Sequence, residues 1–354
     1  MLNLIGPINQ LGYGIATLNI LKSISKIDPV AFWPISQPQV TNKEDFDLIQ
    51  YSMQNATLPD FNSPCIRIWH QNDMAQFVGK GKKIGMPIFE LDEFTKIEKH
   101  HLSNLDNIFV CSSWAKEIIL SNISISQENV CVIPLGVDNE IFKPSQLNNN
   151  KTIFFNCGKW EIRKGHDVLI ESFNKAFDDT DNVELWMMCE NPFLNKEEEQ
   201  IWKNMYINSK LGSKIKIIPR VETQQEVYNI MSKVDCGVFP ARAEGWNLEL
   251  LEMMACGKHV ITTDYSAHKE FCNNNNAFLI PIDSKEKAYD GKWFHGQGNW
   301  AKFEKKQKDY LSEYLRDFYI KNTKKEISIN SNGIETAKRF NWDNSAKEIL
   351  KHAI

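Results

Sequence analysis

The sequence predicts an α/β protein built on parallel sheets, because short apolar runs alternate with amphipathic stretches of helical length over most of the chain. Residues 2–5 are the first expected strand, and residues 15–27 are the helix that follows it. Hydrophobic residues make up 42% and charged residues 24% of the chain, which is the balance of a globular protein with a packed core. With 354 residues, the chain is long enough for two domains.

Later strands are expected wherever polar residues bound a short apolar run, and they span residues 66–69, 108–111, 130–133, 152–156, 184–188, 215–218, 236–239, 260–263 and 278–280. Helices are expected at residues 165–177, 225–233 and about 301–320, and a last helical segment at residues 333–353. The polar run at residues 146–151 precedes a fresh apolar strand, so it predicts a domain linker. The predicted domains are residues 1–147 and 151–332, and a C-terminal helix follows at residues 333–354.

Charge and hydropathy exclude several classes of protein. The formal net charge is −4 and the isoelectric point is near 6.1, so no overall excess of basic residues indicates a nucleic-acid binder. No apolar stretch approaches the roughly 20 residues that span a bilayer, and the first residues form no secretion signal. A cytoplasmic protein is therefore expected, while peripheral membrane contact and the oligomeric state stay open.

Metal and disulfide chemistry also lacks a signal in the sequence. The eight cysteines form no CxxC pair, which predicts buried free thiols in a reducing compartment. His100 and His101 are adjacent and so cannot share a helix face, and no HExxH motif occurs. We therefore expect no metal site.

Residues 234–257 predict a strand, a loop and then a helix, with Asn247 suited to the N-cap and Gly257 to the C-terminal stop. Folds with parallel sheets bind ligands at such loops, because free backbone N–H groups and the helix dipole meet a phosphate there. Glu244 on the loop and Glu252 on the helix could accept hydrogen bonds from the hydroxyls of a sugar and a ribose. The alternative is that both are ordinary solvated acids.

A second block places cations directly after the strand at residues 152–156 and before a helix that begins near Gly165. Fixed cations at this position could neutralise the charge that grows on a departing diphosphate, which needs no metal ion. Lys159 and Lys164 are the candidates. The alternative is a solvated basic turn.

The N-terminal part of the chain offers weaker candidates. Gly12 and Gly14 follow the first strand and could let the backbone approach a donor or its diphosphate, although a structural turn explains them nearly as well. His70 lies in a polar stretch after another expected strand and could face a ligand. It could equally satisfy local backbone groups.

The segment from Glu244 to Gly257 resembles the retaining glycosyltransferases of family 4, whose hallmark is an acid, seven residues and a second acid within the pattern EGxxLxxLEAMAxG. The resemblance implies the GT-B architecture, in which two Rossmann-like domains face a central cleft and a final helix crosses back to the first domain. It implies that the first domain holds mainly the acceptor and the second mainly the nucleotide sugar. It implies transfer of a sugar from a UDP- or GDP-linked donor, with retention and without a metal or other cofactor. The implied acceptor is a glycan or another hydroxyl compound.

The resemblance also assigns roles to the candidates. Lys159 and Lys164 match the cations that hold the diphosphate, although many members carry arginine at the first position. Glu244 is expected at the donor sugar and Glu252 at the ribose. The remaining expected nucleotide contacts, which lie on loops and at a helix start, are Val221, Trp246, Asn247 and Leu248.

The first domain departs from the family pattern at one position. Many members present a histidine after a central strand, whereas the matching stretch at residues 87–92 offers Glu90 or Asp92. Glu90 and His70 are therefore both candidate catalytic residues, with local backbone satisfaction as the alternative for each.

The implied mechanism is front-face attack, in which the departing phosphate accepts the acceptor's proton, because no acid pair is placed as in a glycosidase. Three rival functions remain. The chain could be a nucleotide-sugar epimerase, a non-catalytic module that binds nucleotide sugars, or a transferase whose acceptor is modified DNA.

Overall fold

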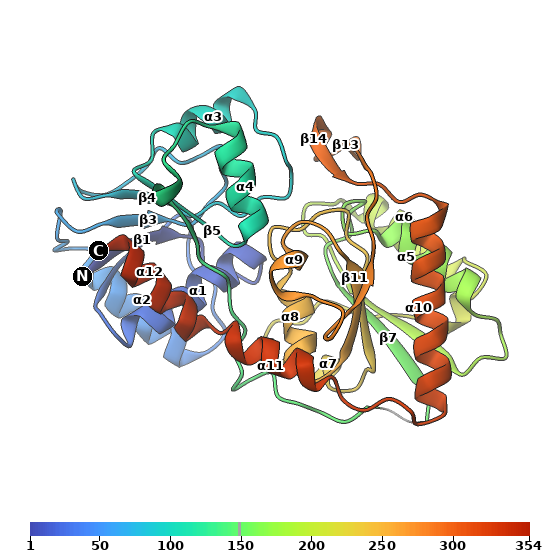
Figure 1. The fold of residues 1–354 in the computed structure, drawn as a ribbon. Helices are drawn as coiled ribbons and strands as arrows, with labels where there is room; N and C mark the ends of the chain where they lie inside the picture. The colour runs from blue at the N-terminus through green and yellow to red at the C-terminus, as the bar shows by residue number, and fades with distance from the viewer. Residues whose placement is uncertain (148–149) are drawn as a thin grey trace. The chain divides into compact units, whose positions relative to one another are not determined.

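A computed structural model describes residues 1–147 and 150–354 and has the predicted α/β fold (Figure 1). The chain forms two compact units, the first from Met1–Val137 with Arg339–Ile354 and the second from Asp138–Lys338. The chain thus enters the second unit before the predicted linker at residues 146–151, part of which lies outside the described residues. Among the described residues, no helix is long and apolar enough to cross a membrane.

The first unit contains a parallel sheet with the strand order β2-β1-β3-β4-β5-β6. Its strands are β1 (Leu2–Gly6), β2 (Val30–Pro34), β3 (Cys65–Arg67), β4 (Lys83–Gly85), β5 (Asn107–Val110) and β6 (Val130–Val132). Its helices are α1 (Gly12–Ser25), α2 (Lys43–Asn55), α3 (Lys96–Ser103), α4 (Ser113–Asn122) and α12 (Trp342–Ala353), with the short 3-10 helix η1 (Gln127–Asn129).

The second unit contains another parallel sheet, with the order β12-β11-β10-β7-β8-β9. Its strands are β7 (Thr152–Gly158), β8 (Val183–Cys189), β9 (Ile215–Ile217), β10 (Cys236–Phe239), β11 (His259–Thr263) and β12 (Phe278–Ile280), and β13 (Lys285–Tyr289) pairs with β14 (His295–Ala301) in an antiparallel hairpin. Its helices are α5 (His166–Ala176), α6 (Lys196–Ile207), η2 (Gly212–Lys214), α7 (Gln224–Met231), α8 (Leu248–Ala255), α9 (His268–Phe271), α10 (Lys305–Thr323) and α11 (Ser331–Arg339).

The sequence does not predict four of the strands, which are β2, β4, β13 and β14. β2 was missed because it follows α1 after a short turn and ends in Trp33-Pro34. β4 was missed because it has only three residues, and its backbone pairing with β3 and β5 defines it more than its composition does. The β13–β14 hairpin was missed because its strands carry charged residues and glycines in place of an apolar run.

The expected single helical segment at the C-terminus is two helices, α11 and α12. The break lies at Asn341, whose extended backbone precedes α12 and whose side chain accepts a hydrogen bond from the Asn344 N–H at 2.9 Å. The backbone at this break pairs with Val137. Ser345 Oγ then donates to the carbonyl of Pro134 at 2.6 Å, so the chain end is fixed to the first unit.

Gly136 lets these two backbone segments approach each other. A Cβ atom at Gly136 would lie 2.3 Å from the Asn341 carbonyl carbon and 2.3 Å from the Trp342 nitrogen, and neither backbone atom can rotate away. Gly12 is the matched contrast, because a Cβ there would meet nothing within 4 Å.

We therefore predict that Gly136→Ala lowers the free energy of unfolding by roughly 1–3 kcal/mol, as expected for an added methyl group in a filled space. The measurement is the urea or thermal unfolding midpoint, with Gly12→Ala as the control. Equal midpoints for the two variants would contradict the close approach at residue 136.

Candidate active site

Five charged residues of the second unit form a continuous chain of ion pairs, here called the charge chain. It runs from Lys159 through Glu161, Arg163 and Glu244 to Lys164. The successive nitrogen-to-oxygen distances are 2.9, 2.8, 2.9 and 2.8 Å. The charge chain thereby joins the loop after β7 to the loop after β10 and brings together three of the predicted site residues.

Burial differs along the charge chain. The side chains of Glu161, Arg163 and Glu244 are each 5% exposed, and that of Lys164 is 11% exposed, whereas that of Lys159 is 36% exposed. Buried charges are costly unless they are paired, so the alternation of sign is what permits this arrangement. The cations at the two ends remain closest to solvent.

Two glycines make room for the charge chain. A Cβ at Gly158 would lie 3.3 Å from Cε of Lys164, so the lysine side chain passes directly over this glycine. Gly165 has φ +74°, in the left-handed region, and a Cβ there would lie 1.9 Å from the carbonyl oxygen of Pro240. The two loops approach this closely only because residue 165 is glycine.

His166, the first residue of α5, is hydrogen-bonded to the loop that carries Glu161 of the charge chain. Its Nδ1 accepts a hydrogen bond from the Glu161 N–H at 3.2 Å, and its Nε2 lies 3.0 Å from Oδ1 of Asn156. These partners assign the proton to Nε2. Burial lowers the pKa of His166 to about 3, so the ring is neutral and positions the loop.

The two acids of the predicted motif have opposite charge states. Burial disfavours the charged form of Glu244, but Lys164 and Arg163 outweigh burial and lower its pKa to about 2. Burial and the nearby Glu249 raise the pKa of Glu252 to about 8, although a hydrogen bond with Gln224 opposes the rise. At neutral pH Glu244 is therefore a carboxylate and Glu252 is mostly a neutral carboxylic acid.

Asn247 caps α8 as predicted, with its side chain accepting a hydrogen bond from the Leu250 N–H at 3.2 Å. Its φ of 84° lies in the left-handed region, which glycine and asparagine tolerate best. Its Nδ2 lies 2.9 Å from Nε2 of His268, which fixes the loop at the start of α8. Gly257 has φ +71° just past the end of α8, as expected for a helix stop.

The other predicted nucleotide contacts are buried or half-buried side chains. The Trp246 side chain is buried against Phe271, with ring centroids 4.8 Å apart. Leu248 is also buried, at the first turn of α8, and Val221 is half-buried in the loop before α7. Their roles at a nucleotide remain predictions.

In the first unit, Tyr13 contacts both His70 and the segment next to Glu90. Its hydroxyl donates to the carbonyl of Ile88 at 2.7 Å, next to the segment that carries Glu90. Its ring also contacts the exposed His70, with centroids 4.8 Å apart. Glu90 is half-buried and contributes to raising the pKa of Tyr13, after burial itself. Sequence reasoning missed Tyr13, although it lies between Gly12 and Gly14.

The two glycines beside Tyr13 differ in their surroundings. A Cβ at Gly14 would lie 2.3 Å from the backbone nitrogen of Asn9, so Gly14 is required by the turn that precedes α1. The space beside Gly12 is open to 4 Å. A role for Gly12 next to a ligand stays a prediction.

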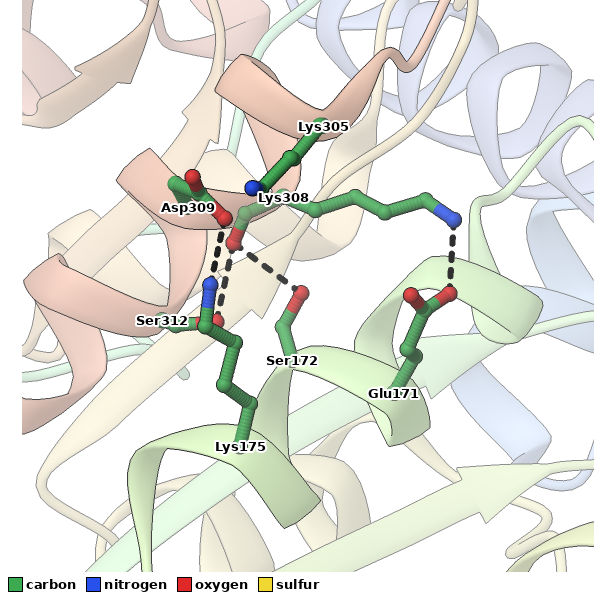
Figure 2. Close-up of a pocket in the computed structure, with 7 residues that line it drawn as sticks. All are labelled: Glu171, Ser172, Lys175, Lys305, Lys308, Asp309 and Ser312. Carbon is green, nitrogen blue, oxygen red and sulfur yellow. Dashed lines mark hydrogen bonds and ion pairs between the residues drawn. The ribbon is translucent and has the colours of Figure 1, made fainter.

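A surface pocket lies apart from the charge chain, between α5 and α10 (Figure 2). Lys175 pairs with Asp309, and Lys308 pairs with Glu171 at 2.6 Å, so each of these lysines is paired with an acid of the facing helix. The pocket contains none of the predicted site residues.

The structural comparisons define the fold family. Sucrose-phosphate synthase from Thermosynechococcus elongatus superposes with a TM-score of 0.73, at 14% identity over 99% of this chain and 97% of that one. HepE from Anabaena, in complex with UDP-glucose, superposes with a TM-score of 0.71, at 13% identity over 99% of this chain and 98% of that one. The fold is that of the GT-B glycosyltransferases.

The sequence comparison gives the family. Residues 137–326, more than half of the chain, match the family described as glycosyl transferases group 1. The chain therefore belongs to the glycosyl transferases of group 1. It is also 26% identical over 253 residues to an uncharacterised glycosyltransferase of Methanocaldococcus jannaschii, a match that covers 72% of this chain and 60% of the relative.

The raised pKa of Glu252 predicts a pH-dependent stability. The folded state holds a proton at Glu252 up to about pH 8, whereas an unfolded glutamate loses it near pH 4.5. The wild type therefore loses stability as pH rises between these values, and Glu252→Gln, which mimics the protonated form, does not share this loss. We predict that the variant gains roughly 2–4 kcal/mol on the wild type between pH 5 and pH 8.5.

The measurement is the unfolding midpoint of both proteins across this pH range. Glu197→Gln, the same change at an exposed position of α6, is the matched control. A constant difference between Glu252→Gln and the wild type at all pH values would show that Glu252 is ionised in the folded protein.

Proposed function

We propose that the protein transfers a sugar from a nucleoside diphosphate donor to a hydroxyl acceptor, with retention at the anomeric carbon and without a metal ion. The observation that carries this proposal is the charge chain, which presents Lys159 and Lys164 as fixed cations at its two ends. Fixed cations stabilise the charge that develops on a departing diphosphate and need no reorganisation when it forms. A UDP- or GDP-linked donor fits this role.

The charge state of Lys164 supports this assignment. Burial alone would lower the pKa of Lys164, but Glu244 and Glu249 outweigh it and raise the pKa above its usual value. Lys164 therefore stays protonated over the whole physiological range. Arg163 lies between two carboxylates, so its charge is already compensated, and its role is to hold Glu161 and Glu244 in place.

The geometry of Glu244 favours front-face attack. Arg163 and Lys164 each form an ion pair with one of its two carboxylate oxygens, at 2.9 and 2.8 Å. The low pKa of Glu244 also makes it a poor base. In the proposed step, the acceptor oxygen bonds to the anomeric carbon as the bond from that carbon to the phosphate oxygen breaks. The phosphate oxygen takes the acceptor's proton, so no protein nucleophile is needed.

Glu252 is proposed to bind the ribose. As a neutral carboxylic acid it can donate one hydrogen bond as well as accept others, which suits a pair of ribose hydroxyls. The complex of HepE with UDP-glucose supports a nucleotide sugar as the donor of this chain. Screening UDP-, GDP- and ADP-sugars for slow hydrolysis tests the proposal without an acceptor, and product analysis separates transfer from epimerisation or mere binding.

We predict that Lys159→Ala and Lys164→Ala each lower donor turnover about 10²-fold or more, because each removes a charge contact that strengthens in the transition state. Added magnesium should restore neither variant. Lys175→Ala, a change of the same kind in the ion-paired pocket beside α5, is the control and should retain activity. Loss of wild-type activity in a chelator would overturn the metal-independent mechanism.

We predict that Glu244→Gln and Glu252→Ala fail in different ways. Glu244→Gln removes the charge that orients Lys164, so donor turnover should fall while affinity for UDP survives. Glu252→Ala should weaken UDP binding by roughly 1–3 kcal/mol, the cost of a lost hydrogen bond at a buried group. Calorimetry with UDP, beside donor-hydrolysis rates, measures both effects. Equal losses of UDP affinity in the two variants would remove the separate assignments.

A further inference from the structure

Two exposed aromatic side chains lie beside the Lys159 end of the charge chain. Phe193, in the loop after β8, is 53% exposed, and Trp293, in the turn of the β13–β14 hairpin, is 42% exposed. Their ring centroids are 6.0 Å apart at an interplanar angle of 72°. Nζ of Lys159 lies 5.5 Å from the Phe193 ring centroid. We call Phe193 and Trp293 the aromatic platform.

The turn that carries Trp293 is held in a defined shape. Oδ1 of Asp290 accepts hydrogen bonds from the backbone N–H groups of Lys292, Trp293 and Phe294 at 2.9, 2.8 and 2.9 Å. Lys292 then forms an ion pair with Glu198 of α6, so the tip of the hairpin is fixed beside the loop of Phe193. These contacts therefore hold the turn that carries Trp293 in one conformation.

The base of the hairpin is also anchored. Trp300 on β14 is 1% exposed, and the Arg242 guanidinium lies over its ring, 5.9 Å from the centroid. Arg242 donates to both carboxylate oxygens of Asp167 on α5 at 2.8 Å. Its backbone carbonyl accepts a hydrogen bond from the Ala301 N–H at 2.9 Å. The hairpin is thus fixed to the second unit at both ends.

We propose that the aromatic platform binds a sugar ring of the acceptor, which makes the acceptor a glycan or glycoside. This inference rests on the proposed function. A pyranose ring has an apolar face of C–H groups and a rim of hydroxyls. An exposed aromatic pair bordered by Lys159, Lys292 and Glu198 offers apolar ring faces with hydrogen-bonding groups at their edge.

The position of the aromatic platform supports an acceptor sugar over a protein partner. Lys159 belongs both to the charge chain and to the edge of the aromatic platform, so a ring bound there lies next to the proposed diphosphate site. Two rings with charged neighbours are a small surface for a stable protein interface, which usually buries about 800 Å² per partner. They match the size of one or two sugar rings.

The test uses the full chain with UDP bound and the methyl α-glycosides of glucose, galactose, mannose and N-acetylglucosamine as probes. Saturation-transfer NMR should show binding of at least one probe through the C–H protons of its ring face. Trp293→Ala should weaken that binding about tenfold. In a transfer assay with the same probe, the variant should raise KM for the acceptor about tenfold, while the Kd for UDP stays that of the wild type.

Tyr289→Ala removes another exposed aromatic of the same hairpin and is the matched control, and Trp293→Phe should restore most of the binding. Wild-type binding by none of the probes, or equal binding by wild type and Trp293→Ala, would overturn the inference. Absence of UDP binding and donor hydrolysis in the wild type would overturn the proposed function instead, so the two failures are distinguishable.

Discussion

The rest of the second unit's site depends on the pairing of Arg163 with both Glu161 and Glu244. Each of these three side chains is nearly fully buried, and a buried charge without a partner is strongly destabilising. The guanidinium can satisfy both acids because its planar fork reaches two carboxylates and the carbonyl of Ala243 at once. Two loops far apart in sequence are therefore held together by one side chain, and the lysines at the two ends take their positions from it.

This arrangement explains why two acids of one motif differ in charge. Glu244 lies between Arg163 and Lys164, which stabilise its ionised form against burial. Glu252 faces burial and the like charge of Glu249, which favour its neutral form. Sequence spacing alone places both acids near one ligand. Only the three-dimensional neighbours decide that one is a fixed anion within the charge chain and the other a proton-bearing group.

Local signals predicted much of the fold and part of the candidate site. The helix cap at Asn247 and the stop at Gly257 depend on adjacent residues, so a sequence pattern is sufficient to find them. Arg163 and Glu161 were missed, although they lie between the predicted lysines, because the partner that gives Arg163 its role is far away in the sequence. The β13–β14 hairpin has no alternating apolar pattern, so the sequence did not predict it. Its geometry is fixed by single contacts such as those of Asp290.

Arg242 links the charge chain to the hairpin. Its N–H donates to the carbonyl of Arg163 at 2.7 Å, and its own carbonyl accepts from Ala301 at the end of β14. Its side chain meanwhile joins Asp167 on α5 to Trp300. One residue of the loop after β10 thus fixes both the buried ion pairs and the base of the hairpin. If the charge chain holds the leaving group and the aromatic platform holds the acceptor sugar, their separation is set by Arg242 within a single unit. Precise spacing of reacting groups is a major source of rate enhancement, so this residue can contribute to transfer without contacting either substrate.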